Sequence, residues 1–147
     1  MGDDKYKNIF DNALIGIYQS TADGRFITAN KAFASILGYN SPESLMASIS
    51  NITQQIYINP NDRQRTINLL KESDHCTIEV QVKRKDGAIV WIMNKVRAVR
   101  DDLGRVVYYE GMAQDITDQK KMEDDLLLMR AKDIMLMDSI LLAGKRL

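Results

Sequence analysis

Hydrophobic and polar residues alternate one by one through much of the second half of the chain, as they do in strands that bury one face. Three segments show this alternation, at 77–83, 90–98 and 106–116. Between them lie two turns that contain Asp and Gly, at 84–87 and 101–104. Because turns of this kind join neighbouring antiparallel strands, the pattern predicts a meander.

The first half of the chain predicts one hairpin and then a series of short helices. Residues 15–20 and 26–29 are expected as two short strands, and the Asp-Gly turn at 22–25 joins them. Helix starts follow at residues that cap helices or place proline in the first turn, namely Asn30, Ser41 with Pro42, and 59–62. Strands and helices segregated in this way predict an α+β fold, with an antiparallel sheet that carries helices on one face.

Helical segments flank this core at both ends. Apolar residues recur at helical spacing within residues 1–14, which predicts an N-terminal flanking helix. No Gly or Pro occurs between the last strand and Leu142, so we expect a long C-terminal helix over 118–147. Thr117 suits its N-cap, because the hydroxyl can accept from an unpaired backbone N–H of the first turn. The expected central domain then spans 15–117.

The C-terminal helix carries apolar residues at alternating intervals of four and three, the spacing of the a and d positions of a coiled coil. The residues of this series that we expect at a dimer interface are Met122, Leu126, Met129, Leu136 and Ile140. Asp133 interrupts the series, and a second series through Leu127 and Ile134 is also apolar. We therefore expect a parallel homodimer, in which two overlapping registers permit rotation or slippage of the paired helices.

Alternation in the strands also predicts which side chains face the helices. The inward-facing residues, with three from the helical half, are candidates for lining a ligand pocket: Phe33, Leu37, Ile56, Ile78, Val80, Ile92, Asn94, Val96, Tyr109, Gly111 and Ala113. The small residues Gly111 and Ala113 leave room either for a ligand or for helix packing. A buried amide at Asn94 needs partners, because an unpaired one costs about 1–3 kcal/mol. It either bonds to backbone or buried water, or it orients a ligand.

Trp91 and Met93 fall on the opposite, charged face of the sheet, where an apolar pair needs cover. The N-terminal helix is the natural cover, through Tyr6, Ile9 and Phe10. We expect this cover to come either from the same chain or from a dimer partner.

Charge and composition narrow the classes of function. Lys and Arg together number 20, as do Asp and Glu, so the chain lacks the basic excess of a nucleic-acid-binding domain. One cysteine and one histidine exclude a disulfide framework and a multi-histidine metal centre. Because the sequence offers no nucleophile–base set, phosphate loop or paired carboxylates, we predict no catalytic residues and no metal. It shows no secretory signal or membrane-spanning run, which predicts a cytoplasmic domain whose parent protein can still be membrane-anchored.

Short motifs along the chain occur in an order that resembles a PAS domain with its C-terminal PAC motif. They are 8–11, 16–18, 23–27, Asn30, Gly38 with Tyr39, 84–87, Trp91, 101–104 and 111–117. The resemblance implies a five-stranded antiparallel sheet in the order 2-1-5-4-3, with helices that enclose a small interior pocket. It also implies a regulatory module, not itself an enzyme, of a bacterial signalling protein such as a sensor histidine kinase or a cyclic-di-nucleotide enzyme.

The resemblance implies that the domain binds haem, flavin, a small organic ligand or nothing. The Asn-Cys-Arg-Phe signature of light-sensing flavin domains is absent, and Cys76 lies at the start of an expected strand instead. A haem ligand is expected on the helix before the meander, but 61–73 holds no histidine, and His75 is expected in an exposed loop. We therefore predict no cofactor, with haem disfavoured and non-covalent flavin left open.

We interpret the chain as a sensory or relay module that binds a small molecule or a partner and forms a homodimer through its flanking helices. The residues expected to couple the sheet to the C-terminal helix, and so to a following effector domain, are Asp115, Ile116 and Thr117. Two alternatives remain. One is a constitutive dimerisation scaffold without a ligand, and the other is a flavin-binding redox sensor.

Overall fold

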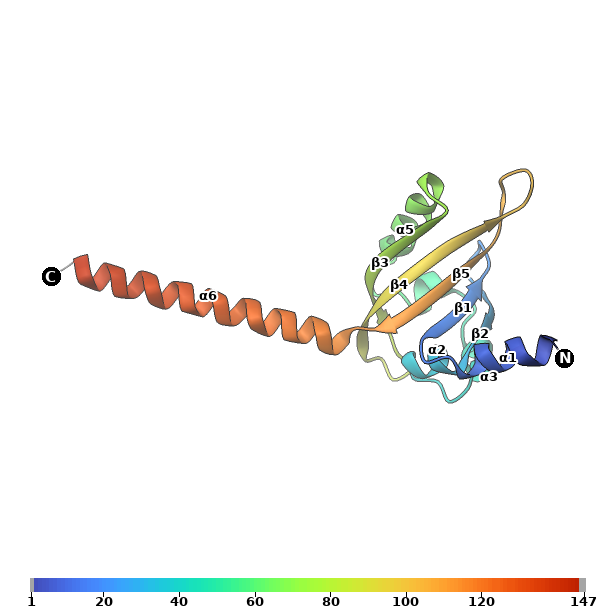
Figure 1. Cartoon of the computed structure of the whole chain (residues 1–147), viewed down its shortest axis with the longest axis horizontal. Helices are drawn as coiled ribbons and strands as arrows, with labels where there is room; N and C mark the ends of the chain where they lie inside the picture. The colour runs from blue at the N-terminus through green and yellow to red at the C-terminus, as the bar shows by residue number, and fades with distance from the viewer. Residues whose placement is uncertain (1, 146–147) are drawn as a thin grey trace. The chain divides into compact units, whose positions relative to one another are not determined.

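The structure, a computed structural model, describes residues 2–145 of the chain (Figure 1). It divides into two units, one that ends at Asp115 and one that begins at Ile116. The first unit contains the sheet and the short helices, and the second is a long helix.

Five strands form one antiparallel sheet within the described part of the chain. They are β1 (Gly16–Ser20), β2 (Phe26–Ala29), β3 (His75–Lys83), β4 (Ile89–Arg100) and β5 (Val106–Asp115). Their order in space is β2-β1-β5-β4-β3, so the last strand of the chain, β5, lies in the middle of the sheet (Figure 1). The expected order 2-1-5-4-3 is confirmed.

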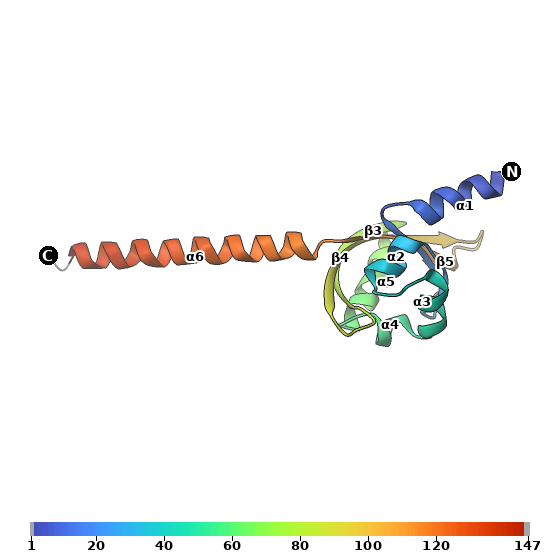
Figure 2. The ribbon, with the colours of Figure 1, turned by 90° about the horizontal axis from the view of Figure 1, so that it is seen from below.

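The helices of the described chain are α1 (Gly2–Asn12), α2 (Lys31–Ile36), α3 (Pro42–Ser48), α4 (Ile52–Gln55), α5 (Asn61–Glu72) and α6 (Thr117–Lys145). Figure 2 shows α2 to α5 on one side of the sheet and α1 on the other. The expected α+β class, with helices gathered on one face, is therefore confirmed.

Side-chain caps explain where two of the short helices begin. Asn30 Oδ1 accepts from the backbone N–H of Phe33 at 2.9 Å, and Ser41 Oγ accepts from the N–H of Ser44 at 3.1 Å. Both caps satisfy donors that the first helical turn leaves unpaired, as the sequence predicts. The short helix α4 was not predicted, because four residues are too few to show a helical period.

The face of the sheet that meets α2 to α5 carries the hydrophobic core. Burial alternates along β4, and the residues expected to face inward are buried. One cluster of buried side chains includes Val80 and Ile92, and a smaller cluster includes Val96 and Tyr109. The inward parity that alternation assigns to these strands is confirmed.

The starts of α6 and of β3 differ from the positions that the sequence predicts. The backbone N–H of Lys120 donates to Ile116 O at 2.9 Å, so Ile116 holds the N-cap position of α6 and Thr117 is its first helical residue. The prediction of Thr117 as the N-cap is therefore wrong. His75, expected in a loop, begins β3, because pairing with Arg97 on β4 extends the strand beyond the alternating segment.

The helix α1 is held at its C-terminal end rather than by its apolar side chains. Asn30 Nδ2 donates to the backbone carbonyls of Phe10 and Ile15, both at 3.0 Å. The side chains of Tyr6 and Ile9 remain 74% and 62% exposed. The expectation that they cover the apolar pair on β4 within the same chain is therefore wrong, and cover by a dimer partner stays a prediction.

One close approach determines how β1 packs beside β5. Gly111 and Tyr18 lie directly opposite each other in the sheet. A Cβ atom on Gly111 would lie only 2.1 Å from Cζ of the Tyr18 ring. The room that the sequence predicts at Gly111 is thus occupied by the Tyr18 side chain.

Gly111→Ala should therefore destabilise the domain. Overpacking of this kind costs about 1–3 kcal/mol of unfolding free energy, and here the added methyl group meets a buried ring. Urea unfolding followed by circular dichroism measures the loss. Gly144→Ala is the matched control, because a Cβ there meets nothing within 4 Å, and it should leave stability unchanged or slightly higher.

Removing the Tyr18 ring should abolish the loss of unfolding free energy caused by Gly111→Ala. In a Tyr18→Ala background, Gly111→Ala should change the unfolding free energy little, because the methyl group then enters vacated space. An equal cost in both backgrounds would show that contact with Tyr18 is not the reason for glycine at this position.

Candidate functional site

Aromatic rings fill the space between the sheet and the helices. The ring of Tyr18 stacks on Phe33 with centroids 4.5 Å apart, and Phe26 meets these two rings edge-on at 5.8 and 5.4 Å. Stacked and edge-on contacts of this kind add to the stabilisation that burial of each ring provides. The face of the sheet expected to hold a ligand is therefore packed with the chain's own side chains.

The buried amide of Asn94 is paired with a side chain. The Tyr18 hydroxyl lies 3.1 Å from Asn94 Oδ1 and 2.9 Å from Nδ2. Burial raises the pKa of Tyr18 far above its usual value, so the phenol stays neutral. No buried side-chain nitrogen or oxygen among residues 2–145 lacks a hydrogen-bond partner. Asn94 is thus satisfied without a ligand.

A cavity of about 20 Å³ remains between α5 and the sheet, enough for about one water molecule. Its polar lining includes Tyr57, Arg63 and Thr66. Of the expected pocket residues, Val96 and Tyr109 line this cavity, and the others are buried away from it. Val96 and Gly111 also line a groove on the opposite face of the sheet. A larger ligand would require side chains to move, and the ligand role of these residues stays a prediction.

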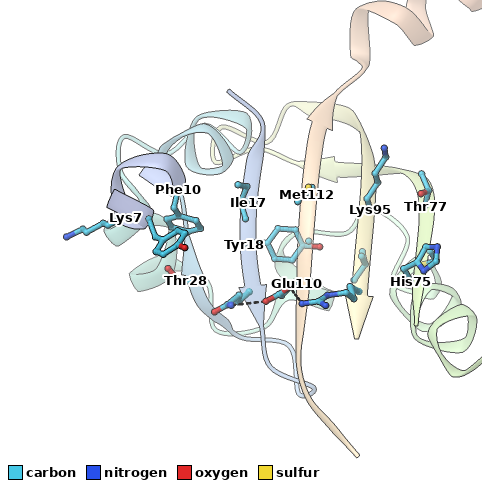
Figure 3. Close-up of a pocket in the computed structure, with 16 residues that line it drawn as sticks. Lys7, Phe10, Ile17, Tyr18, Thr28, His75, Thr77, Lys95, Glu110 and Met112 are labelled. Carbon is cyan, nitrogen blue, oxygen red and sulfur yellow. Dashed lines mark hydrogen bonds and ion pairs between the residues drawn. The ribbon is translucent and has the colours of Figure 1, made fainter. Parts of the chain in front are cut away.

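The opposite face of the sheet carries an open groove of about 660 Å³ beside α1 (Figure 3). Residues directly opposite one another in neighbouring strands cross this outer groove in two rows. The first row runs from β1 to β3 through Ile17, Met112, Lys95 and Thr77. The second runs from β2 to β3 through Thr28, Gln19, Glu110, Arg97 and His75.

The second row contains a polar network centred on Glu110. Arg97 Nη2 donates to Glu110 Oε2 at 2.6 Å, and Gln19 Nε2 donates to Oε1 at 3.3 Å. The bond to Glu110 raises the pKa of Arg97. The side chains of Arg97 and Glu110 are 60% and 32% exposed, so water weakens this ion pair and its contribution to stability is small. Among the described residues, both hydrogen bonds of the Glu110 side chain go to residues of the second row, and none goes to a side chain of the first row.

The single histidine and cysteine lie next to each other at the start of β3. His75 is exposed, whereas Cys76 is half-buried. Burial raises the pKa of the Cys76 thiol, which lowers its fraction of reactive thiolate. Within residues 2–145, no three His, Cys, Asp or Glu side chains gather in a way that could hold a metal ion.

β5 connects the sheet to α6 through a single residue. Asp115, the last residue of β5, pairs with Ile92 on β4, and only Ile116 separates it from Thr117. The structure thus places the expected coupling residues in the connection itself, and their role in signalling stays a prediction.

The residues of α6 expected at a dimer interface are exposed in the single chain. Met122, Leu126, Met129, Leu136 and Ile140 have exposed fractions between 48% and 71%. None of the helices between residues 2 and 145 combines the length and the hydropathy that crossing a bilayer requires.

Comparison with known proteins identifies the family. The family model of the PAS domain matches residues 13–118, so the chain belongs to the PAS domain family. It is similar to the probable diguanylate cyclase DgcE of Escherichia coli K12, with 24% identity over 118 residues. It is also similar to the sensor histidine kinase TmoS of Ectopseudomonas mendocina, with 24% identity over 127 residues. These alignments cover 80% and 83% of this chain but only 11% and 12% of the two relatives.

Solved structures show the same fold. The crystal structure of the PAS domain of a protein from Colwellia psychrerythraea matches with a TM-score of 0.67 and 23% identity, over 80% of this chain and 99% of that chain. The family assignment confirms the resemblance found in the sequence. It also confirms the expected class, a regulatory module that is not itself an enzyme.

Tyr18→Phe should destabilise the domain, because it leaves the amide of Asn94 buried and unpaired. The expected loss is about 1–3 kcal/mol of unfolding free energy, measured by urea unfolding. Adding Asn94→Leu should recover much of this loss, since both partners are then apolar. Tyr108→Phe, which removes a hydroxyl on the outer face of the sheet, is the control and should cost little. Wild-type stability of Tyr18→Phe would contradict the pairing of these two side chains.

Proposed function

We propose that this PAS domain is a sensory or relay module in the cytoplasmic part of a larger signalling protein. In this proposal it acts as a homodimer and passes a signal through α6 to an effector domain. Support comes from two relatives, a kinase and a cyclase, in each of which the matched region is about a tenth of the length. The observation that carries the proposal is the exposed hydrophobic surface of α6.

The helix α6 exposes hydrophobic side chains along most of its length. The large hydrophobic side chains from Met122 to Leu142 are 48–71% exposed. An apolar surface of this extent is typical of a site that another polypeptide covers. Its burial contributes about 25 cal/mol for each Å² removed from water, which favours association.

The spacing of these residues favours a second copy of α6 as the cover. Met122, Leu126 and Met129 step by four and three and therefore lie along one side of the helix. In a parallel pair each of them faces its own counterpart. Asp133 interrupts this series, and a second series passes through Leu127. The pair thus has two packings that differ by a rotation, which is the property a signalling helix needs.

The connection from β5 to α6 is short enough to transmit a displacement. β5 lies between β1 and β4, in the middle of the sheet. Only Ile116 separates it from Thr117, and Asp118 lies in the first turn of α6, where the helix dipole favours a negative charge. In this proposal a shift of β5 reaches α6 through the one residue Ile116. The coupling residues in this proposal are Asp115, Ile116 and Thr117.

The input is a small molecule or a partner that moves β5. The packed interior, with its cavity of about 20 Å³, favours a second candidate function, a constitutive dimerisation scaffold without a ligand. The two functions differ in whether the pairing of α6 ever changes. The third alternative, a flavin-binding redox sensor, requires a stoichiometric yellow chromophore in the purified protein, and a colourless protein would exclude it.

Leu126→Glu should dissociate the homodimer, because it places a charge in the apolar stripe between the two helices. Leu128→Glu is the matched control: it changes the same residue type, 55% exposed against 48% for Leu126, at a position outside both series. Sedimentation velocity measures the oligomeric state. We expect wild type and Leu128→Glu to remain dimeric at concentrations where Leu126→Glu is monomeric. A monomeric wild type, or equal dissociation of both variants, would count against pairing through α6.

A Gly-Gly insertion after Ile116 should uncouple α6 from the sheet. The insertion adds a flexible linker where the chain has one residue, so the first turn of α6 should exchange its amide hydrogens faster while β5 keeps its protection. In a fusion to a histidine kinase core, the variant with the insertion should show a different level of autophosphorylation from the fusion without it. The same insertion after Leu103, in the turn before β5, is the control. Unchanged exchange and kinase output in the Ile116 insertion would favour the scaffold.

A further inference from the structure

We propose that the outer groove of the sheet binds an amphipathic carboxylate, a molecule with a linear apolar tail and one carboxylate head group. The groove occupies about 660 Å³ on the face away from the core, within the range of about 300–1,000 Å³ that is typical of small-molecule sites. Binding there does not depend on the pairing of α6, whereas any signal sent from the groove rests on the function proposed above.

The floor of the groove is apolar along its first row. Ile17 on β1 lies opposite Met112 on β5, and Phe10 of α1 lies at the same end (Figure 3). Met112 is 49% exposed, and Met93 and Ile15 border it in an adjoining hollow. These side chains offer contacts to an alkyl tail, and methionine adapts its shape to an irregular neighbour.

The other end of the same row offers a site for the head group. Lys95 on β4 lies opposite Met112 on one side and Thr77 on the other. Among the described residues Lys95 has no ion-pair partner, and Figure 3 shows its side chain extending away from the Glu110–Arg97 pair. Because Glu110 engages Arg97, the Lys95 ammonium and the Thr77 hydroxyl are available to an anion. One ammonium beside one hydroxyl suits a single carboxylate.

The strand spacing of the sheet indicates how long a ligand must be to reach both ends of the site. β1 and β4 are separated by β5, so the distance from Lys95 across Met112 to Ile17 is two strand spacings, about 10 Å. A medium-length alkyl chain spans this distance. Its head would lie on β4 and its tail on β1 beside α1.

The charges of the groove favour an anionic ligand. Lys7, Lys95 and Arg97 line it, and Glu110 is the acidic residue among the described residues that do so. Because Glu110 engages Arg97, the two lysines leave a net positive charge, which a carboxylate complements.

Decanoate is the probe, used below its micelle-forming concentration with the whole chain of 147 residues. Isothermal titration calorimetry should show binding to wild type. Lys95→Gln and Met112→Glu should each weaken it about tenfold or more, because the first removes the charge that meets the carboxylate and the second places a charge under the apolar tail. Lys83→Gln is the matched control, since Lys83 is an exposed lysine of the same sheet outside the groove, and it should bind as wild type does. Decanol, which lacks the charge, should bind at least about tenfold more weakly than decanoate.

Absence of decanoate binding to wild type would overturn the proposal, and so would equal affinity of wild type and both groove variants. Equal binding of decanol would show that Lys95 does not select a carboxylate and would overturn it as well. The Leu126→Glu variant separates this site from the pairing of α6. It should bind decanoate with wild-type affinity whatever its oligomeric state, and loss of binding together with the dimer would contradict a groove within one copy.

Discussion

The contact between the Tyr18 ring and Gly111 is the constraint on which the arrangement of both sheet faces depends. Tyr18 lies on β1 and Gly111 on β5, while Asn94, the partner of the Tyr18 hydroxyl, lies on β4. One side chain therefore joins three neighbouring strands from inside the sheet. A larger residue at Gly111 would displace the ring, and without the ring the amide of Asn94 would lose its partner. Because packing and hydrogen bonding both hold Tyr18 in place, the interior is occupied by the chain itself.

With the interior occupied, the two surfaces that we propose for recognition lie outside it, in the outer groove and along α6. β5 belongs to the groove through Glu110 and Met112, and between them Gly111 faces the Tyr18 ring. The same strand continues through Ile116 into α6. A ligand in the groove and a rearrangement of the core would thus act on one strand. In the proposed function, the central position of β5 gives the two faces of the sheet a common output.

Local sequence patterns predicted much of this fold, and contacts between distant residues account for most of what they missed. Alternation correctly assigned Ile92 to the buried face of the sheet. The side chains of Asn30 and Ser41 form the helix caps that the sequence predicts. The strand order came from the resemblance to the PAS family, because local patterns do not contain it. The pairing of Tyr18 with Asn94 joins residues 76 positions apart, so the sequence indicated only that the amide needed a partner. The groove was missed because alternation assigns a side chain to a face but not to an opposite residue on the next strand.

The proposed parallel pairing of α6 is tested most directly by disulfide cross-linking between copies. In a Cys76→Ser background, single cysteines are introduced along α6 and mild oxidation is followed on non-reducing gels. A parallel coiled coil brings identical a and d positions face to face, so Met122→Cys, Leu126→Cys and Met129→Cys should cross-link strongly and Leu128→Cys weakly. Equal cross-linking at all four positions, or none at any of them, would contradict a parallel pair through this series.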